Sequence, residues 1–369
     1  MRVVIAPDSF KGTARASDVA RALGAGWASV RGDDDVRVLP MADGGEGTLD
    51  AFELAVPGAR RMPVVVAGPD DRRVEASWLL LPAGDDAPHG TGVVELACTS
   101  GLALLDPLRP LRAHTLGFGQ AIAAALDHGV SRLLLAIGGS ASSDGGAGAL
   151  TALGARFLDA RGATVPLGNL GLHGLASADL SGLRALPPGG ARVLSDVTNP
   201  MLGRQGAAAV FGPQKGADAA AVREIEANLA RLAAMLEVDP ATPGAGAAGA
   251  TGFGLLAWGA QIAPGSAAVA EALGVPAALR DADVVITGEG SFDAQSSSGK
   301  VPGHIAGLAA AHGVRAMLVA GSIRAEPRGF SDALALTELA GGGEAAQERP
   351  LAWLHIAAAR LATTAGTRG

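Results

Sequence analysis

Short runs of Val, Ile and Leu, each ending in a glycine-rich turn, recur along this chain and precede Ala- and Leu-rich stretches. Clear examples are RVVIAPDSFKG (2–12), RLLLAIGGSASSDGGAG (132–148) and DVVITGEG (283–290). Apolar runs without polar alternation are typical of parallel strands that helices cover on both faces. The sequence therefore predicts an α/β fold, in which the turns after the strands gather at the carboxyl edge of the sheet, where ligands bind.

The middle of the chain departs from this rhythm. PVVVAGPDDRRVEASWLLLP (63–82) predicts an antiparallel hairpin, and the stretch TPGAGAAGATGFG (242–254) predicts either a linker or a turn that contacts a ligand. Because 369 residues exceed one typical core, we expect two domains. We predict a parallel, Rossmann-like α/β domain from residues 1–62 and 281–369, with a mixed α/β domain, residues 63–280, inserted between them. The active site is expected in the cleft between the domains.

The overall composition excludes several classes of partner. The net charge is −7 and no basic run is present, which argues against nucleic acid and against an anionic membrane surface. No apolar stretch is long enough to span a bilayer, and the opening MRVVIAP predicts a strand rather than a leader. Cys98 is the only cysteine, so an intrachain disulfide is excluded. We expect a soluble cytoplasmic protein, with homo-oligomerisation left open.

Lysine is rare in this chain and always adjoins a glycine. Of the 29 basic side chains only three are lysines, namely Lys11, Lys215 and Lys300. A compact ammonium group on a slender stem suits phosphate oxygens in a tight loop better than a guanidinium does. The alternative interpretation is that these three lysines occur in turns by chance. We favour the interpretation that the three lysines belong to a site.

Five glycine-rich loops carry acids, and most also carry a hydroxyl or a lysine. One such loop is weak evidence, because glycine also serves as a turn or helix cap and acids serve as N-caps. Five of them at one edge match the needs of phosphoryl transfer: donors for a triphosphate, cations for the moving group, carboxylates for magnesium, and an acid for the acceptor. The acids concerned are Asp8, Asp43, Glu46, Asp144, Asp196, Glu289 and Asp293.

Other catalytic patterns are absent from the sequence. A Walker loop does not fit, since Gly290 and Gly299 are too far apart and Val301 follows Lys300 where Ser or Thr should hold magnesium. No H-E-x-x-H metal motif and no G-x-S-x-G elbow occurs. An NAD(P)-dependent hydroxyacid dehydrogenase would need G-x-G-x-x-G after the first strand, which APDSFKG lacks. A small hydroxyacid-binding protein without chemistry is the other alternative.

Six motifs, from Ala6 to Lys300, resemble those of the bacterial glycerate kinases with a two-domain α/β fold. They are APDSFKG, ADGGEGT, GGSASSDGGAGAL, SDVTNP, GAAAVFGPQKGA and TGEGSFDAQSSSGK. The resemblance implies transfer of the γ-phosphoryl group of ATP to D-glycerate with Mg²⁺, giving 2-phosphoglycerate rather than 3-phosphoglycerate. Departures include Ser142 and Ser143 where Thr-Asn is usual, and Ser195 where Cys is frequent. The segment 114–122 also lacks the usual Tyr and Glu.

With this reaction in view, we assign candidate roles to individual residues. Asp196 orients or deprotonates the acceptor hydroxyl, and Lys300 and Lys11 offset phosphate charge, the former next to a helix that Pro302 begins. The predicted substrate-binding residues are Asp8, Ser9, Asn199, Arg204 (expected to be buried) and Lys215. The predicted nucleotide or phosphate contacts are Gly138, Gly139, Ser140, Asp144, Gly145, Gly288, Gly290, Ser296 and Gly299. The predicted metal ligands are Asp43, Glu46, Glu289 and Asp293.

Overall fold

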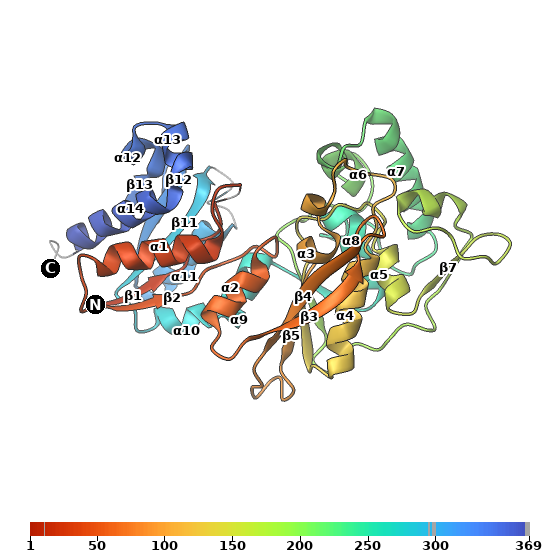
Figure 1. Cartoon of the computed structure of the whole chain (residues 1–369), viewed down its shortest axis with the longest axis horizontal. Helices are drawn as coiled ribbons and strands as arrows, with labels where there is room; N and C mark the ends of the chain where they lie inside the picture. The colour runs from red at the N-terminus through yellow and green to blue at the C-terminus, as the bar shows by residue number, and fades with distance from the viewer. Residues whose placement is uncertain (11, 294–295, 297–299, 366–369) are drawn as a thin grey trace. The chain divides into compact units, whose positions relative to one another are not determined.

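The computed structural model describes residues 1–10, 12–293, 296 and 300–365 (Figure 1). The chain forms two compact units. Unit 1 comprises Met1–Asp43, Asp50–Pro57 and Ser266–Gly369, and unit 2 comprises Gly44–Leu49 and Gly58–Gly265. These boundaries differ from the predicted 62/63 and 280/281, because the strand from Arg60 to Ala67 pairs within unit 2 and the helices after Gly265 pack with unit 1.

Unit 1 contains the parallel sheet that the sequence predicts from its two ends. The strand order is β13-β12-β11-β1-β2, and every pairing is parallel. Residues of β1 alternate between the two sides of the sheet and all but the first are buried, which explains the unbroken apolar run. The strands are β1 (Arg2–Ile5), β2 (Asp35–Val38), β11 (Val284–Phe292), β12 (Arg315–Ile323) and β13 (Asp332–Ala335).

Helices cover both faces of this sheet. Helices α1 (Ala16–Ala28) and α14 (Pro350–Ala365) share a core with β1 and β11, whereas α11 (Val301–His312) connects β11 to β12. Right-handed crossovers that run in opposite directions place α1 and α11 on opposite faces. Ser17 lies inside α1, which begins after Arg15. The other helices of unit 1 are α10 (Val275–Leu279), α12 (Leu336–Ala340) and α13 (Gly343–Glu348). Two more helices, α2 (Thr48–Ala55) and α9 (Gly265–Ala272), begin in unit 2 and continue into unit 1.

The strand order reverses between β1 and β11, so this is the switch point of a doubly wound sheet. Two contacts hold the segments after these strands together. The amide of Asp8 donates to the carbonyl of Gly288 at 2.8 Å, and the hydroxyl of Thr287 donates to the carbonyl of Ala6 at 2.7 Å. The two loops therefore leave the sheet side by side at its carboxyl edge.

Unit 2 contains a mixed sheet with the order β10-β9-β6-β5-β4-β3. The pairs β3–β4 and β4–β5 are antiparallel and the other pairs are parallel, which confirms the predicted hairpin. A short pair, β7 (Arg156–Leu158) and β8 (Ser177–Asp179), lies apart from this sheet. The strands of the six-stranded mixed sheet are β3 (Arg60–Ala67), β4 (Arg73–Leu81), β5 (Thr91–Glu95), β6 (Arg132–Ala136), β9 (Ala191–Leu194) and β10 (Gln261–Ala263).

The stretch 242–254, predicted as a linker or a turn, leads into a buried helix, α8 (Ala247–Ala257). Ala248, Gly249 and Ala250 at its start have left-handed backbones, with φ of 56°, 67° and 65°. The other helical segments of unit 2 are α3 (Ala97–Ser100), η1 (Leu102–Leu104), α4 (Leu116–His128), α5 (Ala147–Ala152), η2 (Asn169–Gly174), α6 (Ala207–Phe211), η3 (Pro213–Lys215) and α7 (Ala219–Ala233).

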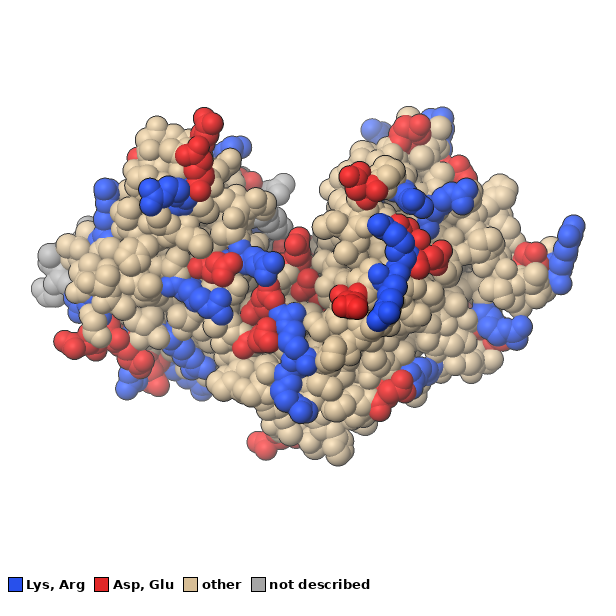
Figure 2. Space-filling view, in the orientation of Figure 1, with Lys and Arg blue, Asp and Glu red and all other residues tan. Residues whose placement is uncertain are grey.

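On the face that Figure 2 shows, basic and acidic side chains lie next to one another over both units. Across the described ranges of the chain, no helix combines the length and the apolarity needed to cross a membrane.

Candidate active site

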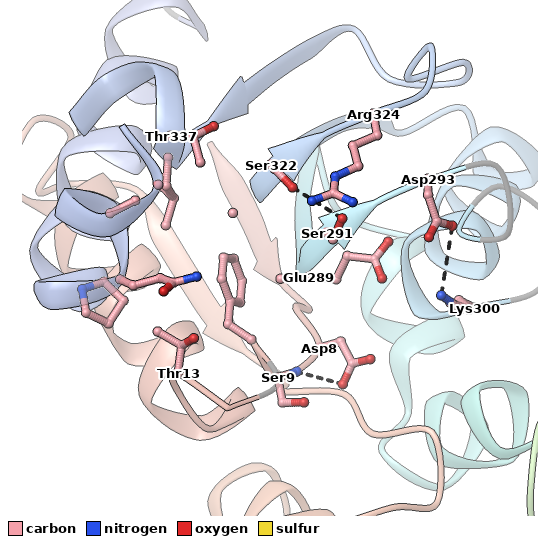
Figure 3. A pocket seen from close by; sticks show the side chains of 18 of the residues that line it. Asp8, Ser9, Thr13, Glu289, Ser291, Asp293, Lys300, Ser322, Arg324 and Thr337 are labelled. Carbon is pink, nitrogen blue, oxygen red and sulfur yellow. Dashed lines mark hydrogen bonds and ion pairs between the residues drawn. The ribbon is translucent and has the colours of Figure 1, made fainter. Parts of the chain in front are cut away.

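A cavity of about 460 Å³ opens in unit 1 at the carboxyl edge of the sheet (Figure 3). Its size is that of an ordinary small-molecule site. The loops after β1 and β11, the end of β12, and helices α12 and α13 contribute to its walls. Seven of the predicted site residues line it together: Asp8, Ser9, Asp43, Glu289, Gly290, Asp293 and Lys300.

The acids of this cavity come from neighbouring parallel strands. Asp8 follows β1, Glu289 lies near the end of β11, and both are only 7% exposed. One carboxylate oxygen of Asp8 accepts from the amide of Ser9 at 2.6 Å. Because carboxylates are poorly stabilised away from water without positive charge, this end of the cavity favours a cation.

Lys300 and Asp293 lie on the α11 side of the cavity. The Lys300 ammonium is 4.0 Å from a carboxylate oxygen of Asp293, which also accepts from the amide of Ser296 at 3.2 Å. Lys300 directly precedes α11, and Pro302 lies in the first turn of that helix, as predicted. The ammonium and the helix N-terminus both favour a bound anion. Ser296 contacts Asp293 and does not line the cavity, and Lys11 and Gly299 lie outside the described residues.

The acidic residues of this cavity are of the chemical type that binds Mg²⁺. Asp43, Glu289 and Asp293 provide carboxylate oxygens in one cavity, and Mg²⁺ prefers oxygen ligands while keeping several waters. Within the described ranges no three His, Cys, Asp or Glu side chains converge as a preformed ligand set. An ion held by one or two carboxylates and by phosphate oxygens needs no such set. Glu46 is exposed in unit 2 and is not among the lining residues.

Sequence reasoning missed three polar residues that line the cavity. Ser291 on β11 and Ser322 on β12 place their hydroxyl oxygens 3.2 Å apart, and Arg324 follows β12 directly. The only signal in the sequence was that these polar residues continue two apolar strands. Gly288, predicted to contact phosphate, instead lies inside β11, where an added Cβ would be 2.0 Å from the Val319 carbonyl oxygen.

In unit 2 the segment 44–49 is held against the ends of β5, β6 and β9. Glu95, which sequence reasoning also missed, accepts from the amides of Gly47 at 3.2 Å and Leu49 at 3.0 Å. Gly44 has φ of +87°, and a Cβ there would be 2.3 Å from the Leu194 carbonyl oxygen. A buried carboxylate at the start of α2 thus fixes this loop.

The loop after β6 differs from the phosphate loop that the sequence predicts. The amides of Gly138 and Gly145 donate to the carbonyls of Gly44 and Gly249, at 2.9 and 3.1 Å, and the Gly139 carbonyl accepts from Leu102. Groups engaged in this way are not available to a ligand. These glycines fold the loop against its neighbours.

Asp144 also has a structural position. It is fully buried, and its carboxylate accepts from the hydroxyl and amide of Thr115, both at 2.9 Å, and from the amides of Gly146 and Gly148, both at 3.1 Å. Four donors satisfy the charge and join the start of α4 to the start of α5. We interpret Asp144 as a residue that supports the loop rather than one that contacts phosphate.

Lys215, predicted to bind substrate, is 2% exposed. Its ammonium donates to the hydroxyl of Ser140 at 2.8 Å and to the carbonyl of Ser142. Burial lowers the pKa of Lys215 from 10.5 to about 7, against the opposing effect of the Asp144 charge. The lysine therefore ties η3 to the loop after β6, and its ammonium group is engaged by that loop.

The remaining predicted residues lie after β9. Asp196 is exposed, and the side chain of Asn199 donates to the Gln205 carbonyl at 2.8 Å. The prediction that Arg204 is buried is wrong, because Arg204 is exposed and lines a shallow groove. Arg204 is also not among the residues that line the cavity of unit 1.

Comparison with known proteins decides the family. A model described as "Glycerate kinase family" matches residues 3–365. The chain belongs to the glycerate kinase family. Two relatives are the glycerate 2-kinase of Escherichia coli K12, 41% identical over 88% of this chain and 86% of its own length, and the glycerate kinase of Bacillus subtilis 168, 43% identical over 88% and 85%.

A solved structure shows the same fold over the whole length. It is the crystal structure of a candidate glycerate kinase 2 from Salmonella typhimurium LT2, with a TM-score of 0.85 and 39% identity, covering 99% of this chain and 98% of that one. The predicted fold class and the predicted phosphotransferase class are both confirmed. The match supports a kinase over the dehydrogenase and the binding protein without chemistry.

Proposed function

We propose that this protein transfers the γ-phosphoryl group of ATP to D-glycerate with Mg²⁺, giving 2-phosphoglycerate. The observation that carries the proposal is the cavity of unit 1, where carboxylates, a hydroxyl and an ammonium group meet at the switch point of the sheet in a glycerate kinase family member. The name of the Escherichia coli relative, glycerate 2-kinase, supports the 2-phosphate as product.

The cavity residues supply what phosphoryl transfer requires. The transition state is loose and spreads negative charge over the transferred group, so positioning and electrostatics account for most of the catalysis. In our proposal the ammonium of Lys300 and the N-terminus of α11 offset that charge, with Lys11 assisting. Asp8 and Ser9 hold substrate hydroxyls at the adjoining loop.

Mg²⁺, when bound, offsets the negative charge of the phosphate groups. Asp43, Glu289 and Asp293 are the residues that would hold it, since they bring carboxylate oxygens to the same cavity. The Lys300 ammonium lies 4.0 Å from a carboxylate oxygen of Asp293 and would help to orient that carboxylate.

Asp196 is our candidate for orienting the acceptor hydroxyl. It is exposed at the carboxyl end of β9, where a substrate can reach it. A loose transition state needs an acid that positions the hydroxyl and accepts its proton late. This role requires residues of both units in one reaction, and the predicted cleft between the domains stays a prediction.

The direct test uses purified protein with ATP, MgCl₂ and D-glycerate, and phosphorus NMR of the product. The two phosphate esters have different spectra, so one measurement tests the reaction and its regiochemistry. We expect the 2-phosphate ester, with no ester when MgCl₂ is replaced by EDTA. Hydrolysis of ATP without any ester would refute the proposal, and the 3-phosphate ester would correct it.

Two variants test the residues. We expect Lys300→Ala and Asp196→Asn each to lower kcat by about 10²- to 10³-fold, the loss typical of removing one group that stabilises transition-state charge. Arg328→Ala is the matched control, because Arg328 is 83% exposed and pairs only with Glu326 among the described residues. The melting temperature should stay within about 2 °C in all three variants. Folded variants with near-normal kcat would remove these assignments.

A further inference from the structure

Part of the cavity wall is built by β11 and β12, two strands that stay paired beyond the rest of the sheet. β1 pairs with β11 only as far as Ile286, whereas β11 and β12 stay paired to Phe292 and Ile323. Ser291 is directly opposite Ser322 in this register. Directly paired residues of parallel strands project to the same side, and the two hydroxyls are 3.2 Å apart.

Two glycines directly precede these serines on the paired strands. Gly290 and Gly321 both line the cavity. A Cβ on Gly321 would lie 2.3 Å from the Gly290 carbonyl oxygen, so the close approach of the strands requires glycine at that position. The two strands are therefore held close together where they line the cavity.

Arg324 completes the wall. Its amide donates to the carbonyl of Phe292 at 2.8 Å, and Phe292 is fully buried against the edge of the Phe330 ring, so the backbone at Arg324 is anchored. The side chain is exposed and lines the cavity, and Figure 3 shows its guanidinium beside Ser291 and Glu289. Within the described part of the chain, this guanidinium forms no ion pair.

We propose that Ser291, Ser322 and Arg324 form an oxyanion subsite that binds a carboxylate or a phosphoryl group of a substrate. The proposal rests on the proposed function and replaces Arg204 as the arginine of the site. A guanidinium presents parallel N–H donors that match two oxygens of either group, and the serine hydroxyls add donors on the same side. Four carboxylates line this cavity, so an anionic substrate needs the positive charge of Arg324 as well as that of Lys300.

Arg324→Met tests the subsite, because it keeps most of the stem and removes the charge and the donors. We expect the KM of one substrate to rise at least tenfold, and Arg324→Lys to recover only part of the loss. Arg328→Met, four residues away on the surface, should leave both KM values unchanged. The double variant Ser291→Ala, Ser322→Ala should raise the same KM as Arg324→Met.

Calorimetry with D-glycerate alone and with ADP alone identifies the group that is bound. Weaker D-glycerate binding with unchanged ADP binding assigns the subsite to the carboxylate, and the reverse assigns it to the phosphates. Unchanged KM and Kd values in a folded Arg324→Met variant would overturn the proposal. If the wild-type protein forms no phosphoglycerate, the proposed function fails, whereas an ADP affinity that still depends on Arg324 would keep the subsite.

Discussion

The buried ammonium of Lys215 predicts an unusual pH dependence of stability. In the unfolded chain this group has an ordinary pKa near 10.5, and burial lowers the pKa to about 7 in the folded protein. Between these two values the unfolded chain binds more protons than the folded one, so the free energy of unfolding rises with pH. Each pKa unit is worth about 1.4 kcal/mol, which limits the whole linkage to about 5 kcal/mol.

The window from pH 7 to 8.5 isolates this effect. The chain has no tyrosine and only two other lysines, and burial raises the pKa of Cys98 from 9.0 to about 12, so its opposing linkage acts above pH 9. Across the window, Lys215 alone should raise the free energy of unfolding of the wild type by about 1.5 kcal/mol. Lys215→Met, an apolar side chain of similar length, should lack this rise.

Urea unfolding at several pH values measures the difference. Trp78 and Trp258 belong to unit 2, so a Trp27→Phe, Trp353→Phe background makes fluorescence report on that unit. Lys300→Met is the control, since its side chain is 42% exposed. The absolute stability of Lys215→Met is not decisive, because Ser140 and Ser142 lose a donor. Equal slopes with pH for wild type and Lys215→Met would refute the reasoning.

Two further predictions concern loops of unit 2. Asp144→Ala should lower the free energy of unfolding by about 3–5 kcal/mol, because Thr115 and two buried amides lose a charged acceptor. Urea unfolding measures this loss of stability. A loss below about 1 kcal/mol would contradict the structural role of Asp144. Gly44→Ala should cost about 3 kcal/mol, since it combines a left-handed backbone with a Cβ against Leu194. Gly47→Ala, with the same sign of φ but open space, is its control and should cost less.

The part of the fold that depends on local pattern could be predicted from the sequence. Unbroken apolar runs such as Val3–Ile5 predict buried parallel strands, and the stretch 63–82, two apolar runs around a polar turn, predicts a hairpin. The conformation of the stretch 242–254 could not be predicted in the same way. Its glycines and alanines have weak preferences, and the left-handed turn at Ala248 and Ala250 depends on packing against the loop after β6.

The candidate site could be predicted only in part. Asp8, Glu289 and Lys300 were found because they follow strands of one sheet, and the parallel topology brings them together. The same pattern also predicted Asp144 and Lys215 as site residues. The sequence alone does not distinguish a polar side chain that binds a ligand from one that forms hydrogen bonds within its own loop. Arg324 was missed because none of the six motifs includes it, and only the register with β11 places it in the cavity.

Unit 1 contains both ends of the chain, and this has a consequence for synthesis on the ribosome. Val3 of β1 pairs with Val284 of β11, so β1 has its inner neighbour supplied only about 280 residues later. At roughly 5–20 residues per second, the delay is about 15–60 s. During that time all strands of unit 2 emerge and can pair, while β1 and the apolar side of α1 still lack α14 and β11. The segment of β1 and α1 should therefore depend on chaperone protection during synthesis.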